Sequence, residues 1–285
     1  LKKIIEKKID KNFSENLVLS GGCALNSLSN GKIMESKKFN NLFVPYSPGD
    51  SGGAIGASLY YLSNKKKYKS FVNIQNPYIG SQYSNDQILK LLKKYSNSKF
   101  NILEIKNDKK MYSEVSKLLT KSKIVGWFKG RMEFGPRSLG NRAILANPTN
   151  INMREIINSK IKRRESFRPF APVILKNEKS KWFKTNKSNQ YMSFVETILP
   201  EKRSEIPAVT HIDGTGRVQT VLREQNPNLY DLIEEFYKIT KVPILLNTSF
   251  NENEPIVENP EQAIDCFIRT DMDALVIENI LLLKK

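Results

Sequence analysis

Residues 124–148 carry the clearest group of side chains that could bind an anion. The segment reads IVGWFKGRMEFGPRSLGNRAILANP, an apolar run followed by a glycine-containing loop with Arg131, Arg137 and Arg142. Arginine is permanently charged and grips phosphate or carboxylate through two parallel hydrogen bonds. Glycine lets the backbone approach a ligand, so that main-chain N–H groups can also contact an anion. The segment therefore predicts an anion site, and phosphate is the anion that it favours.

Two other interpretations of this segment were weighed. Gly130 and Gly135 have the separation of the phosphate loop G-x-x-x-x-G-K-[ST], but Pro136 stands where that loop needs its lysine. Proline brings neither a cation nor an N–H group, so the segment is not a phosphate loop of that type. A surface loop with solvated arginines remains the structural alternative.

The segment GRMEFGPRSLGNRAILANP resembles the signature of the O-carbamoyltransferases that act on antibiotics and nodulation factors. Five further segments follow the order of that family: GGCALN, PGDSGGAIGA, FRPFAPVI, HIDGTGRVQTV and LLNTSFN. The resemblance implies a C-terminal domain, related to threonylcarbamoyl-AMP synthases, that makes carbamoyl-adenylate from carbamoyl phosphate and ATP with Mg2+. It also implies an N-terminal domain of the actin/sugar-kinase-like ATPase superfold that passes the carbamoyl group to a hydroxyl-bearing small molecule or sugar.

The resemblance implies an α/β fold in two parts. Residues 1–80 match the C-terminal portion of the actin-like transfer domain, with a polar, lysine-rich linker at Asn64–Tyr78. Residues 81–285 match the adenylate-forming domain with its twisted sheet. The chain starts with Leu and contains no upstream H-x-x-x-H, so it is interpreted as a fragment that lacks the metal-binding histidines of the family.

The expected chemistry requires positive charge more than a nucleophile, because two polyanions must meet while phosphate leaves. Lys162 precedes a predicted buried strand and Arg168 lies at its start. Arg217 closes a glycine-rich turn, and Ser249 and Asn251 follow a predicted strand end. The expected catalytic residues are Arg137, Lys162, Arg168, Arg217 and Ser249. The expected nucleotide-binding residues are Arg131, Arg142, Asn251, His211, Gly21, Gly22 and Asn26.

Some of these residues also have a purely structural interpretation. Gly21 and Gly22 connect a predicted strand to a helix, where glycine often serves geometry alone. His211 is the single histidine, and without a recognisable nucleophile pattern it is not assigned as a general base. Asp50 is either an N-cap residue or an orphaned ligand of the family's metal, expected to be Fe2+ or another divalent transition metal.

Composition bounds the class of protein. Of 285 residues, 39% are hydrophobic, and no apolar run reaches the length of about 20 residues that spans a bilayer. The two cysteines form no disulfide framework, so a cytoplasmic enzyme with no membrane association is expected. The net charge of +17 allows an RNA-binding module as the alternative from another class, but no stacked-aromatic signature supports nucleic acid. A threonylcarbamoyl-AMP synthase proper and a homodimer are left open.

Hydrophobic periodicity predicts the elements that position these residues. Helices are expected over residues 23–34, 52–62, 84–95, 111–122, 154–161, 228–240 and 261–269. Strands are expected over residues 17–19, 42–44, 102–105, 124–128, 167–175, 191–198, 208–212, 218–222, 242–246 and 274–277. The small residues of the helix at 52–62 predict close packing against another helix.

Overall fold

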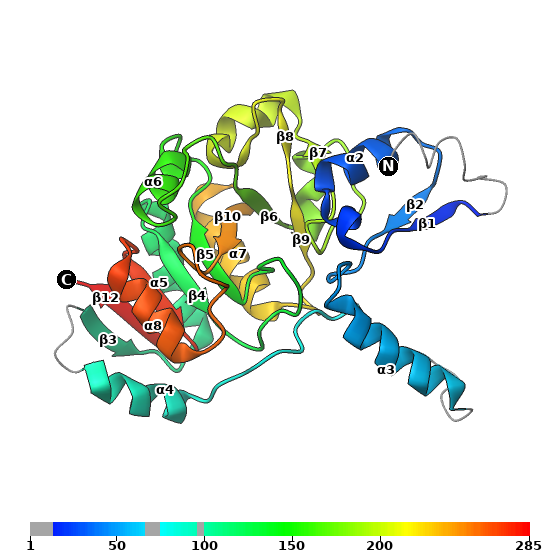
Figure 1. Cartoon of the computed structure of the whole chain (residues 1–285). Coiled ribbons are helices and arrows are strands. Elements are labelled where there is room, and N and C mark those ends of the chain that lie inside the picture. The colour runs from blue at the N-terminus through cyan, green and yellow to red at the C-terminus, as the bar shows by residue number, and fades with distance from the viewer. Residues whose placement is uncertain (1–13, 66–74, 96–99) are drawn as a thin grey trace.

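A computed structural model describes residues 14–65, 75–95 and 100–285, and its centre is a mixed sheet (Figure 1). This sheet has eight strands in the order β3-β12-β11-β4-β5-β10-β6-β9. The strands are β3 (Phe100–Glu104), β4 (Val125–Phe128), β5 (Arg142–Ala146), β6 (Ala171–Leu175), β9 (Gln219–Val221), β10 (Ile244–Ser249), β11 (Ala274–Ile277) and β12 (Ile280–Lys284). Only the β11–β4 and β6–β9 pairs of this sheet are parallel. The predicted α/β class is confirmed.

Helices cover both faces of this sheet, which is why most residues of its central strands are apolar. Every residue of β4, β5, β6 and β11 is buried. On one face α5 (Asp108–Thr120) packs against α7 (Pro227–Thr240), and α8 (Pro260–Arg269) covers β4 and β11 from the opposite face (Figure 1). The remaining helices of this part are α4 (Asn85–Leu92) and α6 (Met153–Lys160).

Local sequence signals explain where the helices begin. The predicted capping box of α4 is present, because Ser84 accepts from the Gln87 N–H group and the Gln87 side chain accepts from the Ser84 N–H group. Helix α7 begins after Asn226, whose side chain accepts from the Leu229 N–H group at 3.1 Å. Its buried residues recur at helical spacing along one face, as the sequence predicts: Leu229, Leu232, Ile233 and Phe236.

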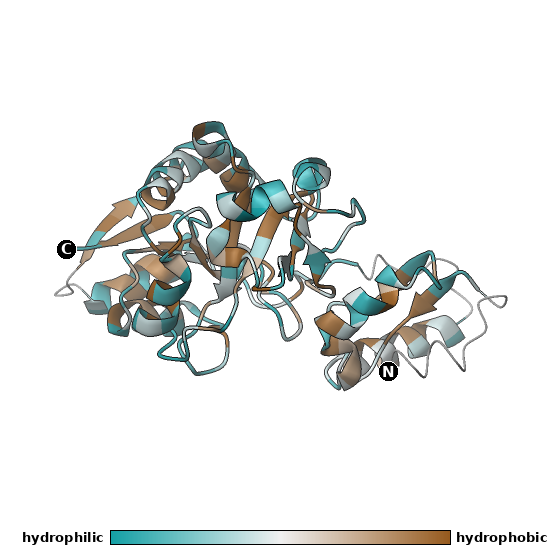
Figure 2. Ribbon diagram, turned by 90° about the horizontal axis from the view of Figure 1, so that it is seen from above, coloured by the Kyte–Doolittle hydropathy of each residue, from teal (hydrophilic) through white to brown (hydrophobic). Residues whose placement is uncertain are grey.

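The N-terminal part is much smaller. Its two parallel strands, β1 (Asn16–Val18) and β2 (Asn41–Phe43), pack with α2 (Ser27–Glu35) around the buried side chains of Leu17, Ile33 and Phe39. Figure 2 shows this part to one side of the larger body, whose strands are coloured mainly as apolar. Helix α3 (Gly52–Asn64) projects from it, and none of the helix residues is buried (Figure 1). The predicted close packing of this helix is therefore wrong for the described part of the chain, which places no helix against it.

The two parts meet where α2 contacts the segment that follows Tyr191. The Asn30 side chain donates to the Ser193 carbonyl oxygen at 3.0 Å, and the Val195 N–H group donates to the Ser27 carbonyl oxygen at 3.0 Å. A Cβ atom on Gly31 would lie 2.4 Å from the Val195 carbonyl oxygen, so glycine is what permits this approach.

Several predicted elements need correction. The strand expected over residues 208–212 is a short 3-10 helix, Pro207–Val209, because the chain turns there instead of pairing. The strand expected over residues 191–198 is reduced to β7 (Glu196–Thr197), which pairs with β8 (Thr215–Gly216). The helix expected over residues 23–34 is broken by Asn26 into a 3-10 turn and α2.

Strands β5, β8 and β12 are additional to the predicted ones. Residues 66–74 of the predicted linker lie outside the described residues. No helix in the described ranges combines the length and apolar character needed to span a bilayer.

Candidate functional site

The loop between β4 and β5 is organised by one buried carboxylate. Glu133 accepts from the N–H groups of Leu139 at 2.7 Å and Asn141 at 2.8 Å. Gly135 and Gly140 both have positive φ, and a Cβ atom on Gly135 would lie 2.5 Å from the Tyr46 carbonyl oxygen. These glycines therefore serve close packing rather than the main-chain anion contact that the sequence predicts.

Two arginines of this loop have structural surroundings. Arg142 is fully buried, its guanidinium lies 3.5 Å from the centre of the Phe128 ring, and it donates to the carbonyl oxygens of Gly130 and Ser81. Burial lowers the pKa of Arg142 to about 10, and nearby carboxylates oppose that shift. Arg131 is exposed and donates to the Ile79 carbonyl oxygen at 3.0 Å. Neither residue lines the cavities described below. Their observed role is to hold the loop, and their expected part in nucleotide binding stays a prediction.

Arg137, the third arginine of the loop, lies in a different environment. Its guanidinium donates to the Leu25 carbonyl oxygen at 3.3 Å and faces a cavity of about 350 Å³. Four arginines and a histidine line this arginine cavity, and none of its described lining residues is acidic. These lining residues are the arginines Arg137, Arg164, Arg168 and Arg217 and the histidine His211. Ser27 of the N-terminal part completes one wall.

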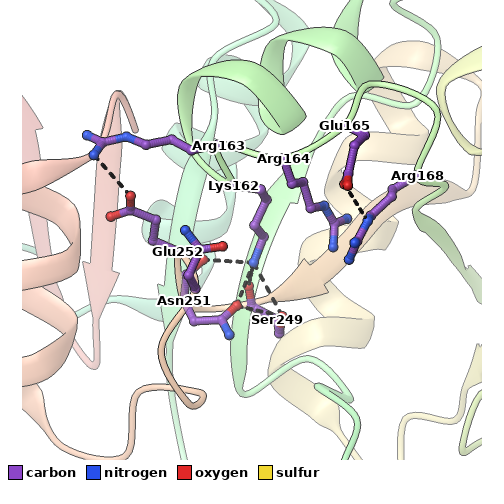
Figure 3. Close-up of a pocket in the computed structure, with 9 residues that line it drawn as sticks. Lys162, Arg163, Arg164, Glu165, Arg168, Ser249, Asn251 and Glu252 are labelled. Atoms are coloured by element: carbon purple, nitrogen blue, oxygen red, sulfur yellow. Dashed lines mark hydrogen bonds and ion pairs between the residues drawn. The ribbon is translucent and has the colours of Figure 1, made fainter.

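A second cavity, of about 640 Å³, lies beside the arginine cavity, and we call it the lysine pocket (Figure 3). The two cavities share Arg164, Arg168 and Ser249. The lysine pocket is lined by Lys162, Arg163, Arg164, Glu165, Arg168, Ser249, Asn251, Glu252 and Asn253. The structure thus brings all five expected catalytic residues to two adjoining cavities.

Lys162 lies at the centre of the wall of the lysine pocket (Figure 3). Its ammonium lies 2.6 Å from the Ser249 carbonyl oxygen, 2.6 Å from Asn251 Oδ1 and 2.8 Å from the Asn251 carbonyl oxygen. The Ser249 hydroxyl is also 3.3 Å away and donates to Asn251 Oδ1 at 2.7 Å. These oxygens are uncharged, so they orient the ammonium without neutralising it.

The protonation of Lys162 is set by its burial. The residue is 2% exposed, and burial, assisted by the positive charge of Arg164, lowers the pKa of its ammonium to about 7. An anion that enters the pocket would favour the charged form and raise this pKa again. The protonation of Lys162 would therefore change when an anion binds.

The acidic residues of the lysine pocket are already paired with arginines at its rim. Glu165 pairs with Arg168 at 2.9 Å, and Glu252 pairs with Arg163 at 3.1 Å (Figure 3). Both ends of the Glu165–Arg168 pair are more than half exposed, so this pairing is weak and can be exchanged for a ligand.

Arg217 faces the arginine cavity at a cost in electrostatic energy. Burial lowers its pKa to about 10, and the positive charges of Arg137 and Arg164 add to that effect. Its Nε atom is buried without a hydrogen-bond partner among the described residues. A buried donor and three clustered guanidinium groups are both stabilised by a bound anion.

The tautomer of His211 follows from its neighbours. Thr215 Oγ1 donates its one proton to Asp213 Oδ1 at 2.6 Å, so it accepts from His211 Nδ1, which is 3.0 Å away. Burial lowers the pKa of His211, so the ring is neutral near pH 7 and its Nε2 atom carries a lone pair.

Arg164 is the residue that the sequence did not reveal, since a solvated helix end explains it equally well. It lines both cavities, and its guanidinium donates to Asn158 Oδ1 at 2.8 Å and lies 5.2 Å from the centre of the Phe170 ring. Asn158 is fully buried and also donates to the Arg168 carbonyl oxygen at 2.9 Å. Only its position beside Lys162 in the sequence could have drawn attention to it.

The expected nucleotide-binding residues of the N-terminal part lie outside both cavities. Gly21 has positive φ and its N–H group donates to the Pro48 carbonyl oxygen at 2.6 Å, and Gly22 begins the 3-10 turn. Asn26 caps α2 by accepting from the Ser29 N–H group at 2.9 Å. These residues remain predictions for a ligand, with turn geometry and capping as their observed roles.

Asp50 does not cap a helix, because α3 begins after Ser51, and its side chain is exposed. Within the described ranges, no group of three or more His, Cys, Asp and Glu side chains could hold a metal ion. The donors present around Asp50 therefore do not fit a transition-metal site.

Comparisons with known proteins show which family the chain resembles. The family model described as "Carbamoyltransferase C-terminus" matches residues 116–284, and "Carbamoyltransferase N-terminus" matches residues 2–59. The chain is 39% identical to nodulation protein NolO of Bradyrhizobium diazoefficiens over 94% of its length and 49% of that protein. It is 35% identical to nodulation protein U of Rhizobium tropici over 83% of its length and 38% of that protein.

An uncharacterised protein of Synechocystis sp. is 40% identical, over 95% of the chain and 48% of that protein. The chain spans about half the length, or less, of these relatives. Full-length HypF in its phosphate- and nucleotide-bound form matches with a TM-score of 0.42 and 19% identity, over 65% of this chain and 22% of HypF. On the family models and the relatives together, the chain belongs to the carbamoyltransferase family.

Proposed function

We propose that the larger part of this chain forms carbamoyl-adenylate from carbamoyl phosphate and ATP, and that the carbamoyl group then passes to a hydroxyl acceptor. The observation that carries the proposal is the arginine cavity. Four arginines face it, and none of its described lining residues is acidic. Both substrates are polyanions, and arginine matches their phosphate groups in geometry as well as in charge.

The two cavities divide the substrates between them in this proposal. The larger lysine pocket, of about 640 Å³, receives the triphosphate, and the arginine cavity, of about 350 Å³, receives the carbamoyl phosphate. Arg168 and Ser249 line both, so the reacting groups meet there. Mg2+ would accompany ATP, held mainly by phosphate oxygens and water, as is usual for this ion.

The proposed reaction has two steps. Water first cleaves carbamoyl phosphate to carbamate and phosphate. A carbamate oxygen then attacks the α-phosphate of ATP, the bond to the β-phosphate breaks, and pyrophosphate leaves. His211 Nε2 can accept a proton from the attacking water, and Arg137 and Arg217 stabilise the departing phosphate.

Lys162 and Arg168 stabilise the charge that develops on the α-phosphate and on pyrophosphate. The Ser249 hydroxyl donates to Asn251 in the structure and is free to turn towards a phosphate oxygen. Ser27 lines the arginine cavity and the Leu25 carbonyl oxygen accepts from Arg137, so the N-terminal part lies beside this cavity. In this proposal an acceptor would approach the adenylate from that side.

The proposal is tested by supplying the chain with carbamoyl phosphate and Mg-ATP and following phosphate and pyrophosphate. We expect both products, and we expect Arg137→Ala and Arg168→Ala each to reduce their formation by about 10²-fold or more, the usual scale for one electrostatic stabiliser. Arg223→Ala is the matched control, because Arg223 forms one surface ion pair with Asp231. Wild-type rates in both site variants would show that the cavity is not the site of the reaction.

A further inference from the structure

Arg269, the last residue of α8, lines neither cavity, yet it pairs with Glu252 and Glu254, two acidic residues of the loop between β10 and α8. Its Nε atom lies 3.2 Å from Glu252 Oε2, and its Nη2 atom pairs closely with Glu254 Oε1. A cation at a helix C-terminus also interacts with the helix dipole. The planar guanidinium group of Arg269 also bridges two carboxylates that belong to one loop.

Glu254 is the residue around which this loop is folded. Its carboxylate accepts from the N–H groups of Glu252 at 3.2 Å and Asn253 at 3.0 Å. Burial alone would raise the pKa of Glu254, but these hydrogen bonds and Arg269 outweigh it and lower the pKa. The carboxylate is therefore ionised, and it fixes the backbone from Glu252 onward.

Asn251 connects this loop to Lys162. Its Nδ2 atom donates to the Glu254 carbonyl oxygen at 2.5 Å, which turns Oδ1 towards Lys162, 2.6 Å away. Because Nδ2 and Oδ1 belong to one rigid amide, the position of Glu254 determines where Oδ1 can hold the ammonium. A second arginine, Arg163, pairs with the other carboxylate oxygen of Glu252 at 3.1 Å.

We propose that Arg269 is a positioning residue for Lys162, which acts through Glu254 and Asn251 to hold the ammonium at the wall of the lysine pocket. Arg269 itself touches no substrate. Its effect on reaction rate rests on the proposed function, but its effect on Lys162 does not. Loss of Arg269 would free the loop, admit water to Lys162 and misplace the ammonium.

The experiment compares Arg269→Ala, Arg269→Lys and the control Arg223→Ala in the full chain. Lysine 13Cε NMR, with the Lys162 resonance assigned by Lys162→Arg, reports the titration midpoint of Lys162 without any substrate. We expect Arg269→Ala to raise that midpoint by more than one pH unit, because water reaches the ammonium. We also expect kcat for pyrophosphate formation to fall by about 10- to 100-fold, the scale for a misplaced group.

Arg269→Lys keeps the charge at the helix end but lacks the planar guanidinium group. We therefore expect Arg269→Lys to unfold with the free energy of wild type. Its Lys162 midpoint and its kcat should lie between those of Arg269→Ala and wild type. Glu254→Gln breaks the same link from the loop side and serves if Arg269→Ala folds poorly. Because it also removes a carboxylate that raises the pKa of Lys162, we expect it to repeat the fall in kcat and not the rise in the midpoint. A Lys162 midpoint unchanged in folded Arg269→Ala, or a kcat unchanged in Glu254→Gln, would overturn the proposal. A wild-type chain that forms no pyrophosphate would overturn the proposed function instead, and the titration would still decide the role of Arg269.

Discussion

Arg137 and Arg217 face the same cavity from different segments of the chain, and the charge of Arg137 adds to burial in lowering the pKa of Arg217. These two cations disfavour each other, and the buried Nε atom of Arg217 has no hydrogen-bond partner in the part of the chain that the structure describes. The repulsion between the two arginines destabilises the protein without a ligand, and a bound anion would reduce it. Active sites commonly contain this kind of perturbed group.

Replacement of Arg217 therefore separates binding from folding. We expect Arg217→Met to leave the free energy of unfolding equal to that of wild type or higher, because repulsion among the arginines is reduced. The same variant should lose most of the rise in Tm that inorganic phosphate or carbamoyl phosphate gives wild type. Thermal unfolding with and without each anion measures both effects. An equal phosphate-induced shift in the two proteins would contradict the assignment of Arg217 to the anion.

Arg142 should behave in the opposite way. Its guanidinium is fully buried and donates to carbonyl oxygens of three residues, Gly130, Asn141 and Ser81. Arg142→Ala leaves these acceptors unpaired and opens a cavity beside Phe128, so we expect a loss of about 2–4 kcal/mol in the free energy of unfolding. Urea denaturation measures it, with Arg131→Ala as the exposed control. A loss below about 0.5 kcal/mol, the scale of a neutral surface change, would show that Arg142 is not structural.

Lys162 gives the stability a dependence on pH whose sign is fixed by the direction of its shift. Its folded pKa of about 7 lies below the ordinary value of 10.5, so the unfolded chain binds the extra proton between these values. The penalty for burying the ammonium is thus fully present below pH 7 and disappears as pH rises towards 10.5. We expect the stability of wild type relative to Lys162→Met to rise by up to about 1.4 kcal/mol per pH unit across this window.

Urea denaturation of both proteins from pH 6 to 9.5 measures this difference and cancels the titration of other groups. A flat difference would mean that the ammonium remains charged throughout. In that case the uncharged oxygens around Nζ outweigh the effect of burial.

A buried ion pair fixes the segment that carries the other wall of the arginine cavity. Lys179 and Glu196 are both buried and lie 2.7 Å apart, and Asn189 donates to the same carboxylate at 2.9 Å. Breaking such a pair from one side typically costs about 3–5 kcal/mol, because the remaining charge stays buried. We expect Lys179→Met to show a loss of that size in urea denaturation, and Lys179→Met with Glu196→Leu to recover much of it. A double variant less stable than the single one would indicate that the pair is strongly favourable by itself.

Much of the fold could be predicted because its signals are local. The capping box at Ser84 and the spacing of buried residues along α7 needed no tertiary information. The strand β12 was missed because it follows β11 after only Glu278 and Asn279, without the usual glycine turn, and Glu278 adopts a positive φ instead. The apolar runs of β11 and β12 are therefore almost continuous in the sequence, and the pattern predicts only the first of them as a strand.

The site could be predicted in part, for a different reason. Arg168, Arg217 and Ser249 belong to motifs, Lys162 comes a few residues before one of them, and the structure does bring the four together. Arg142 belongs to the same motif as Arg137, yet the contacts that make it structural come from Ser81 and Gly130, which no local pattern reveals. The sequence shows which residues are cationic, but only tertiary contacts show whether a cationic side chain already has its hydrogen-bond partners within the protein.

The position of β10 in the sheet has a consequence for how this protein is made. Thr248 pairs with Ile144 of β5 and Asn247 pairs with Ala171 of β6, so β10 lies between two strands that are synthesised long before it. Pairings this distant in sequence form slowly, because loop-closure entropy is lost before contacts reward it. Until β10 leaves the ribosome, β5 and β6 each carry an unpaired apolar edge, which is a template for association with other chains. Translation that stalls before Ile244 should therefore yield aggregates rather than a smaller folded protein.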